Sequence, residues 1–230
     1  MKNIKIIVHD WDDTITNSFE TYSGWYGDFA GYHDLPISGK AGLLKLIKKN
    51  WGKRPEDICQ EIWGDATTGK DFSKLFNEFI NSEAFDTLKY TPQPFEGIAT
   101  TLSKLREKYV LGILSSANHA AIVRSYTKHI APKLSHHNFV IAKEHTTYHK
   151  PDPKVFDHVF ETINNPDIKE EHILYVGDNL FDYFAARDRG IPFIAVTSGV
   201  TTRQVFLKNG LDINYILKSF NELPHHLKIG

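Results

Sequence analysis

Five short apolar runs, rich in β-branched residues, constrain the fold of this chain more than any other feature. They span residues 4–8, 110–114, 139–142, 173–176 and 193–196. Because nearly every position in each run is apolar, the runs are typical of strands buried on both faces of a parallel sheet. Helical patterns at 120–129, 153–163 and 182–189 separate the last four runs. This alternation predicts an α/β fold with a doubly wound, Rossmann-like parallel sheet.

A long segment between the first two runs interrupts the alternation. Residues 17–91 carry helical patterns and no convincing strand, and aromatic side chains recur there at three- and four-residue spacing, as at Phe19, Tyr22, Tyr26 and Phe29. This spacing is typical of helices that pack against one another. We therefore expect an inserted all-helical domain at residues 17–91 and an α/β core formed by residues 1–16 and 92–230.

Charge and cysteine content indicate which binding partners and which cellular location to expect. The chain has 27 basic and 28 acidic residues and a formal net charge of −1, so it has no overall positive field for nucleic acid or anionic lipid. Its apolar runs are far shorter than the ~20 residues of a membrane helix. Cys59 is the single cysteine, and no signal-peptide pattern follows Met1. We expect a soluble, cytoplasmic protein that binds neither nucleic acid nor membrane.

Polar residues follow four of the five runs directly or within a short loop. The first run ends in His-Asp-Trp-Asp-Asp-Thr at 9–14, the second in Ser-Ser-Ala-Asn at 115–118, and the fourth in Gly-Asp-Asn-Leu-Phe-Asp at 177–182. The loop after the third run reaches Lys-Pro-Asp-Pro at 150–153. Since ligands of open parallel sheets bind beyond the carboxyl ends of the strands, these segments are the candidate site.

Each of these residues has an ordinary alternative role, because Asp, Ser and Asn are common helix N-caps and a lysine in a loop is usually solvated. Considered together, these residues are poorly explained by such ordinary roles. If the first and fourth strands pair, Asp10, Asp12 and Asp178 lie at neighbouring strand ends, where like charges repel unless a cation or a proton offsets them. A small site with oxygen ligands suits Mg²⁺.

The order of these motifs resembles the haloacid dehalogenase superfamily of phosphohydrolases. The resemblance rests on the DxDxT pattern at 10–14, a serine after the second strand, a lysine followed by Pro-x-Pro, and GDxxxD at 177–182. The helical insert after the first motif is similar to the branch that contains phosphoglycolate phosphatase and β-phosphoglucomutase. In that superfamily a phosphate ester is attacked by an aspartate, which forms an aspartyl-phosphate.

The resemblance implies a role for each candidate residue. Asp10 would be the nucleophile, and the Asp10 and Asp178 carboxylates with the Asp12 backbone carbonyl would bind Mg²⁺. Lys150 would neutralise the phosphoryl group. Ser115, with Ser116 as the alternative if the register is shifted by one, and Asn118 would complete the phosphate-binding set.

The Asp12 side chain would donate a proton to the leaving group and later accept one from water. Dehalogenases of the superfamily lack this second aspartate, so its presence argues for phosphoryl transfer. Asp182 is expected to order metal-bound water, with an exposed position in the first turn of a helix as the alternative.

Two residues depart from the family pattern. Asp13 stands where glycine is commonest, although aspartate tolerates unusual backbone angles. His9 replaces an apolar residue, and we expect it to be a hydrogen-bonded core histidine, with tuning of the site's electrostatics as the alternative.

The segment at 64–70 matches GxxxxGK, the start of a phosphate-binding P-loop. Its context argues against that function, since the preceding residues look helical and Asp71 replaces the required Ser or Thr. We interpret the segment as a substrate-specificity loop of the inserted domain, bounded by Gly64. Lys70 would meet a second anionic group of the substrate there, or be solvated.

The sequence therefore predicts a Mg²⁺-dependent phosphatase that hydrolyses a small phosphorylated metabolite, with phosphoglycolate as the first candidate. Two alternatives stay open. The first is a phosphosugar mutase, an isomerase of the β-phosphoglucomutase type. The second is a catalytically idle ligand-binding or regulatory module.

Overall fold

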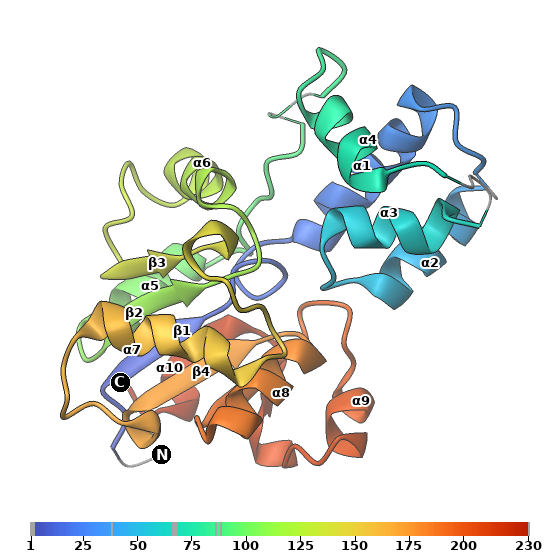
Figure 1. Cartoon of the computed structure of the whole chain (residues 1–230). Coiled ribbons are helices and arrows are strands. Elements are labelled where there is room, and N and C mark those ends of the chain that lie inside the picture. Colours follow the sequence, from blue (N-terminus) through green and yellow to red (C-terminus); the bar gives the residue numbers. More distant parts are fainter. Residues whose placement is uncertain (1–2, 38, 66–68, 86, 88, 230) are drawn as a thin grey trace. The chain divides into compact units, whose positions relative to one another are not determined.

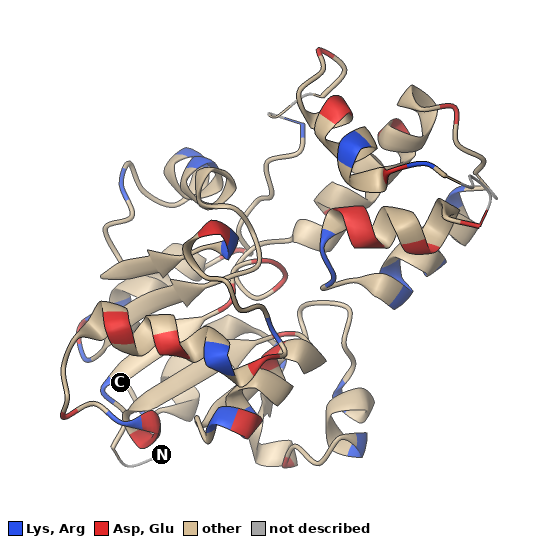
Figure 2. Ribbon diagram, viewed as in Figure 1, with Lys and Arg blue, Asp and Glu red and all other residues tan. Residues whose placement is uncertain are grey.

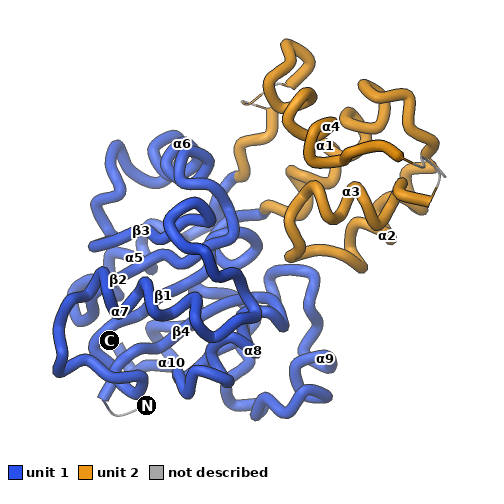
Figure 3. Tube along the Cα trace, viewed as in Figure 1, with its two compact units in different colours: residues 1–17, 93–230 blue, residues 18–92 orange. Residues whose placement is uncertain are grey.

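The computed structural model describes residues 3–37, 39–65, 69–85, 87 and 89–229. The chain divides into two compact units (Figure 3). Unit 1 comprises residues 1–17 and 93–230, and unit 2 comprises residues 18–92. Lys and Arg are interspersed with Asp and Glu on the helices of both units (Figure 2).

Unit 1 is built on a parallel sheet whose described strands have the order β3-β2-β1-β4-β5-β6 (Figure 1). The strands are β1 (Ile6–His9), β2 (Val110–Leu114), β3 (Phe139–Ile141), β4 (Ile173–Gly177), β5 (Phe193–Val196) and β6 (Ile216–Leu217). Every pairing between neighbours is parallel. The central strands are buried throughout, as their uninterrupted apolar runs require.

Helices cover both faces of this sheet. They are α5 (Ile98–Arg106), α6 (His119–His129), α7 (Asp157–Ile163), α8 (Leu180–Arg189), α9 (Arg203–Lys208) and α10 (Leu223–His226). Because side chains alternate along a strand, Ile6 and Val8 pack in a core with α7, α8 and α9, whereas Ile7 packs with α5, α6 and α10 on the other face. The result is a three-layer α/β/α core, which confirms the predicted fold class.

Several elements differ in detail from those expected. The helix predicted at 153–163 is divided into a 3₁₀ segment, Pro153–Phe156, and α7, with Pro153 in the first turn. The first strand begins at Ile6 rather than at residue 4. No strand is predicted from the sequence at β6, because its two residues are too few to show a pattern.

Unit 2 is helical over its described residues. It contains α1 (Ser18–Tyr32), α2 (Lys40–Asn50), α3 (Pro55–Trp63) and α4 (Phe72–Ile80). The aromatic residues of α1 form a core with the other helices, in which Phe29, Ile47 and Phe79 are fully buried. Cys59 of α3 is buried in the same core. None of the described helices, in either unit, has the length and hydrophobicity that crossing a membrane needs.

The two-sided burial of the sheet predicts a large difference between two positions of β2. Ile113 is 0% exposed and Val110 is 39% exposed. Ile113→Ala should lower the free energy of unfolding by about 2–5 kcal/mol, because it leaves a cavity in the core. The matched control Val110→Ala should cost less than about 1 kcal/mol. Urea unfolding followed by circular dichroism measures both, and equal losses would contradict this description of the sheet.

Candidate active site

The strand order places the candidate site at the point of the sheet where the order of the strands reverses. β1 lies between β2 and β4, so the chain builds the sheet outward on opposite sides of the β1–β4 pair. Crevices form at such switch points beyond the carboxyl ends of the strands. Asp10 directly follows β1 and Asp178 directly follows β4, and the Asp10 N–H donates a 2.9 Å hydrogen bond to the Val176 carbonyl.

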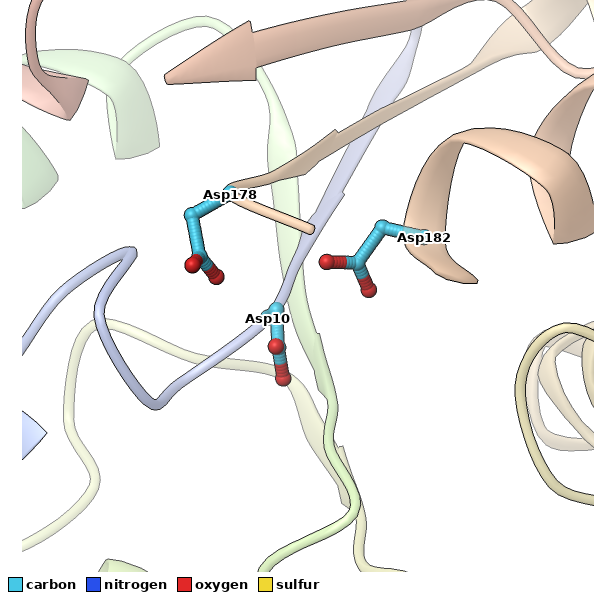
Figure 4. Close-up of side chains that lie close together, drawn as sticks. All are labelled: Asp10, Asp178 and Asp182. Carbon is cyan, nitrogen blue, oxygen red and sulfur yellow. The ribbon is translucent and has the colours of Figure 1, made fainter. Parts of the chain in front are cut away.

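Three carboxylates converge at this position. Asp10, Asp178 and Asp182 each offer an oxygen within 4.8 Å of those of the other two (Figure 4). Their exposed fractions are 8%, 2% and 1%, respectively. Asp182 therefore belongs to the buried cluster, and the alternative of an exposed residue in the first turn of α8 is wrong.

Lys150 joins the cluster from the loop after β3. Its Nζ lies 2.6 Å from Asp182 Oδ1 and 3.1 Å from Asp10 Oδ1. Burial opposes the charged form of Lys150, but the facing Asp10 and Asp182 carboxylates raise its pKa above the usual value. The Lys150 side chain is thus a buried ammonium held beside Asp10.

Tyr175 of β4 completes this network, and its role was missed from the sequence. Its hydroxyl accepts a 3.1 Å hydrogen bond from Lys150 Nζ and lies 2.9 Å from Asp182 Oδ1 and 3.1 Å from the Leu114 carbonyl. The only signal was a hydroxyl in an otherwise apolar strand two residues before the Gly-Asp pair. The Tyr175 hydroxyl therefore links Lys150 to the sheet by hydrogen bonds.

The cluster holds more negative charge than its surroundings balance. Burial raises the pKa of Asp10 to about 7, with Lys150 opposing this and Asp182 and Asp12 adding to it. Burial also raises the pKa of Asp178 well above its usual value, and Asp13 and Asp182 contribute in the same direction. A bound cation would relieve this repulsion.

The donor set fits a small, hard divalent cation. Asp178 Oδ1 accepts a 3.3 Å hydrogen bond from Thr14, whereas Asp178 Oδ2 is buried and has no hydrogen-bond partner among the described residues. Oxygen donors of this kind suit Mg²⁺. Asp10 and Asp178 would hold the ion, while Asp182 Oδ1 already faces Lys150.

Two glycines make room for the carboxylates. A Cβ added at Gly199 would lie 2.0 Å from Asp178 Oδ2, and one added at Gly177 would lie 2.5 Å from the Asp182 carboxyl carbon. Both positions therefore need glycine for close approach of the backbone to the acidic side chains.

Asp12 and Asp13 follow Asp10 in the same loop. Asp12 is partly exposed and its charge raises the pKa of Asp10, so the two carboxyls are close enough to interact. Asp13 has a φ of 56°, which confirms that aspartate serves here in a left-handed conformation. Ser198 fixes this turn by donating a 2.7 Å hydrogen bond to the Asp13 carbonyl.

The serines after β2 differ in exposure. Ser115 is buried and its Oγ accepts a 3.1 Å hydrogen bond from the Ala117 N–H, whereas Ser116 is exposed. Asn118 is the N-cap of α6, and its Oδ1 accepts from the Ala121 N–H. The carbonyl side of the Asn118 amide is therefore engaged in capping, which leaves its NH₂ group for the expected phosphate contact.

Two candidate specificity residues lie in unit 2. Gly64 directly follows α3, and Lys70 is exposed just before α4. Residues 66–68 of the P-loop-like segment lie outside the described residues. The helical context that argued against a P-loop is present, since residues 55–63 form α3. A role for Gly64 and Lys70 in substrate choice stays a prediction.

Comparisons with known proteins identify the family of this chain. The sequence profile of the haloacid dehalogenase-like hydrolases matches residues 7–196. A phosphoglycolate phosphatase of Mesorhizobium japonicum is 30% identical over 205 residues, which cover 87% of this chain and 86% of that protein.

Solved structures share the fold. A Bacteroides fragilis protein described as haloacid dehalogenase-like is 23% identical, with a TM-score of 0.79 and coverage of 96% of this chain and 99% of the other. A haloacid dehalogenase-like hydrolase of Streptococcus pneumoniae is 18% identical, with a TM-score of 0.77 and coverage of 99% and 100%.

Fold and site together define the class of protein. A doubly wound α/β core carries a lysine and three buried carboxylates at its switch point, with a helical unit inserted after the first strand. The chain belongs to the haloacid dehalogenase-like hydrolase family. The family, the fold class and the assignment as a hydrolase are thereby confirmed as the sequence predicted them.

The crowding of carboxylates predicts that Asp178 lowers the stability of the ion-free protein and is needed for cation binding. At pH 7 and with EDTA present, Asp178→Asn should raise the free energy of unfolding by about 1 kcal/mol, because it removes one of several repelling buried groups. The variant should lose the rise in melting temperature that Mg²⁺ gives the wild type. Thermal unfolding with and without Mg²⁺ measures both effects.

The exposed Asp167→Asn is the matched control, and it should change neither quantity. A wild type that Mg²⁺ does not stabilise would contradict the assignment of the cluster as a cation site.

Proposed function

We propose that this enzyme is a Mg²⁺-dependent phosphatase that hydrolyses a small phosphorylated metabolite through an aspartyl-phosphate. One observation carries the proposal: a buried lysine ammonium lies 3.1 Å from the carboxylate of Asp10, inside an acidic cluster at the switch point of the sheet. A cation fixed beside a carboxylate nucleophile is the arrangement that attack on an anionic phosphate ester requires.

The first requirement is to neutralise the substrate. A phosphate ester repels Asp10 until its charge is balanced, and the Lys150 ammonium supplies one fixed positive charge at the site of attack. The Asp10 and Asp178 carboxylates and the Asp12 carbonyl would hold Mg²⁺, which when bound supplies the remaining charge neutralisation. Tyr175 and Asp182 keep the lysine in place through their hydrogen bonds.

Asp10 then attacks phosphorus as the bond to the leaving oxygen breaks. The Ser115 oxygen accepts from the Ala117 N–H, and its hydroxyl hydrogen would donate to a phosphoryl oxygen. Water later attacks the aspartyl-phosphate and releases phosphate, which restores the Asp10 carboxylate.

Asp12 serves both steps as acid and base. Its carboxyl gives a proton to the departing alkoxide and then takes one from the attacking water. This role needs Asp12 protonated while Asp10 is ionised, and Lys150 favours the ionised form of Asp10 by lowering its pKa against the effect of burial. Partial exposure of Asp12 allows it to reach the leaving group.

Phosphoglycolate is the first substrate to test, because a relative that covers most of the chain is named for that activity. A phosphosugar mutase is the nearest alternative and would return the phosphoryl group to a sugar instead of water. An idle binding module would need no intact nucleophile, acid and lysine, and all of these are present here. A cytoplasmic setting stays a prediction.

A substrate panel separates these functions. The purified chain is incubated with phosphoglycolate and other small phosphate esters, with and without Mg²⁺, and free phosphate is measured. A phosphatase releases phosphate only with Mg²⁺. A mutase instead converts a sugar phosphate, supplied with its bisphosphate, into an isomer, and an idle module does neither.

The nucleophile assignment predicts a specific loss. Asp10→Asn should reduce Mg²⁺-dependent phosphate release by on the order of 10⁴-fold or more, because the amide cannot attack phosphorus. The variant should remain folded, as judged by circular dichroism and melting temperature. Asp167→Asn is the control and should keep full activity; near-normal turnover by Asp10→Asn would remove the proposed mechanism.

A further inference from the structure

Two histidines form a hydrogen-bonded chain behind the nucleophile. His9, the last residue of β1, is fully buried, and its Nδ1 lies 2.7 Å from the Asp10 carbonyl oxygen. Its Nε2 lies 2.7 Å from Nε2 of His137, which stands in the loop between α6 and β3. An apolar side chain would fill this core position without the cost of burying polar atoms, so the pair calls for an explanation.

The partners fix where the protons are. A carbonyl oxygen can only accept, so His9 carries its proton on Nδ1 and donates it to Asp10. The neutral ring then accepts at Nε2, and His137 must carry its proton on Nε2. His137 Nδ1 is left as a buried acceptor with no hydrogen-bond partner among the described residues.

Both rings are neutral and held in place. Burial lowers the pKa of His9 to about 4 and that of His137 well below its usual value. The Phe220 ring packs edge-on against His9, and Tyr126 packs against His137 with ring centroids 5.6 Å apart. The direction of hydrogen bonding, from His137 to His9 to the Asp10 carbonyl, is therefore determined by the structure.

The hydrogen bonds that link the two histidines end at the peptide group between Asp10 and Trp11. The carbonyl of the Asp10–Trp11 peptide accepts from His9, and the Trp11 N–H belongs to the same peptide group. A peptide that accepts a hydrogen bond at its oxygen becomes a stronger donor at its nitrogen. The His137–His9 pair thus polarises the peptide group that joins Asp10 to Trp11.

We infer that His9, with His137 behind it, is a positioning residue that orients and polarises the Asp10–Trp11 peptide and thereby holds the backbone of Asp10 in place. The effect on turnover rests on the proposed function. The hydrogen-bond pattern itself does not, so it is tested separately and without substrate.

The first test is nitrogen NMR of the wild-type protein labelled at histidine with ¹⁵N. The expected spectrum shows His9 protonated at Nδ1 and His137 protonated at Nε2, both neutral at pH 7. A His9 ring protonated at Nε2, or a charged ring in either residue, would overturn the inference.

The second test compares two variants of His9. Asn places an N–H donor near the position of Nδ1, whereas Leu provides none. His9→Leu should lower kcat about tenfold, as expected for one lost hydrogen bond near the reacting atoms, and should shift the Trp11 amide proton upfield. His9→Asn should keep kcat within about threefold of wild type and leave the Trp11 signal near its wild-type position.

A second pair of variants tests the link to His137 in the same way. His137→Gln keeps an N–H near Nε2, and His137→Leu does not. The Gln variant should retain the wild-type Trp11 signal, whereas the Leu variant should shift it in the direction seen for His9→Leu.

These outcomes separate the inference from simple packing and from the proposed function. If the histidines only fill the core, the Asn and Leu variants change kcat and the Trp11 signal equally, and the inference is overturned. If the wild type hydrolyses no phosphate ester, the proposed function fails while the NMR arm still decides the positioning role. Melting temperatures confirm that each compared variant is folded.

Discussion

The crowding of buried carboxylates at the carboxyl ends of β1 and β4 is the constraint on which the rest of the site depends. Asp10, Asp178 and Asp182 present oxygens within 4.8 Å of one another, and Lys150 pairs with two of them. Burial raises the pKa of Asp10 and of Asp178, so the folded chain stores electrostatic repulsion there. A bound cation would relieve that repulsion and would also neutralise an anionic phosphoryl group, which would link cation binding to the proposed attack.

The fold supports this arrangement from several directions. Strand order brings the ends of β1 and β4 together, and the glycines at 177 and 199 let the backbone approach the carboxylates closely. Tyr175 reaches from β4 to the lysine, so the cationic group is fixed by the sheet as well as by its ion pairs. His9 contacts the backbone of the same residue, at the Asp10 carbonyl. Asp10 is thus positioned both at its carboxylate and at its backbone.

Much of the fold and of the site could be predicted because each signal was local. Uninterrupted apolar runs identified the five longer strands, and Asp10 and Asp178 were found because they directly follow two of them. Tyr175 and His137 could not be found in this way. Their partners are Lys150 and His9, distant in sequence, and neither residue stands in a recognisable motif. Asp182 shows the same limit, since its position in a first helical turn does not reveal that it is 1% exposed.

The most direct test of the central claim is the position of a bound divalent ion. Crystals grown with Mn²⁺ would locate the ion by its anomalous scattering. A single strong peak between Asp10 and Asp178, about 2.1 Å from one oxygen of each, is the expected result for an octahedral site of this kind. An ion found elsewhere on the chain, with the two carboxylates left unbridged, would contradict the account.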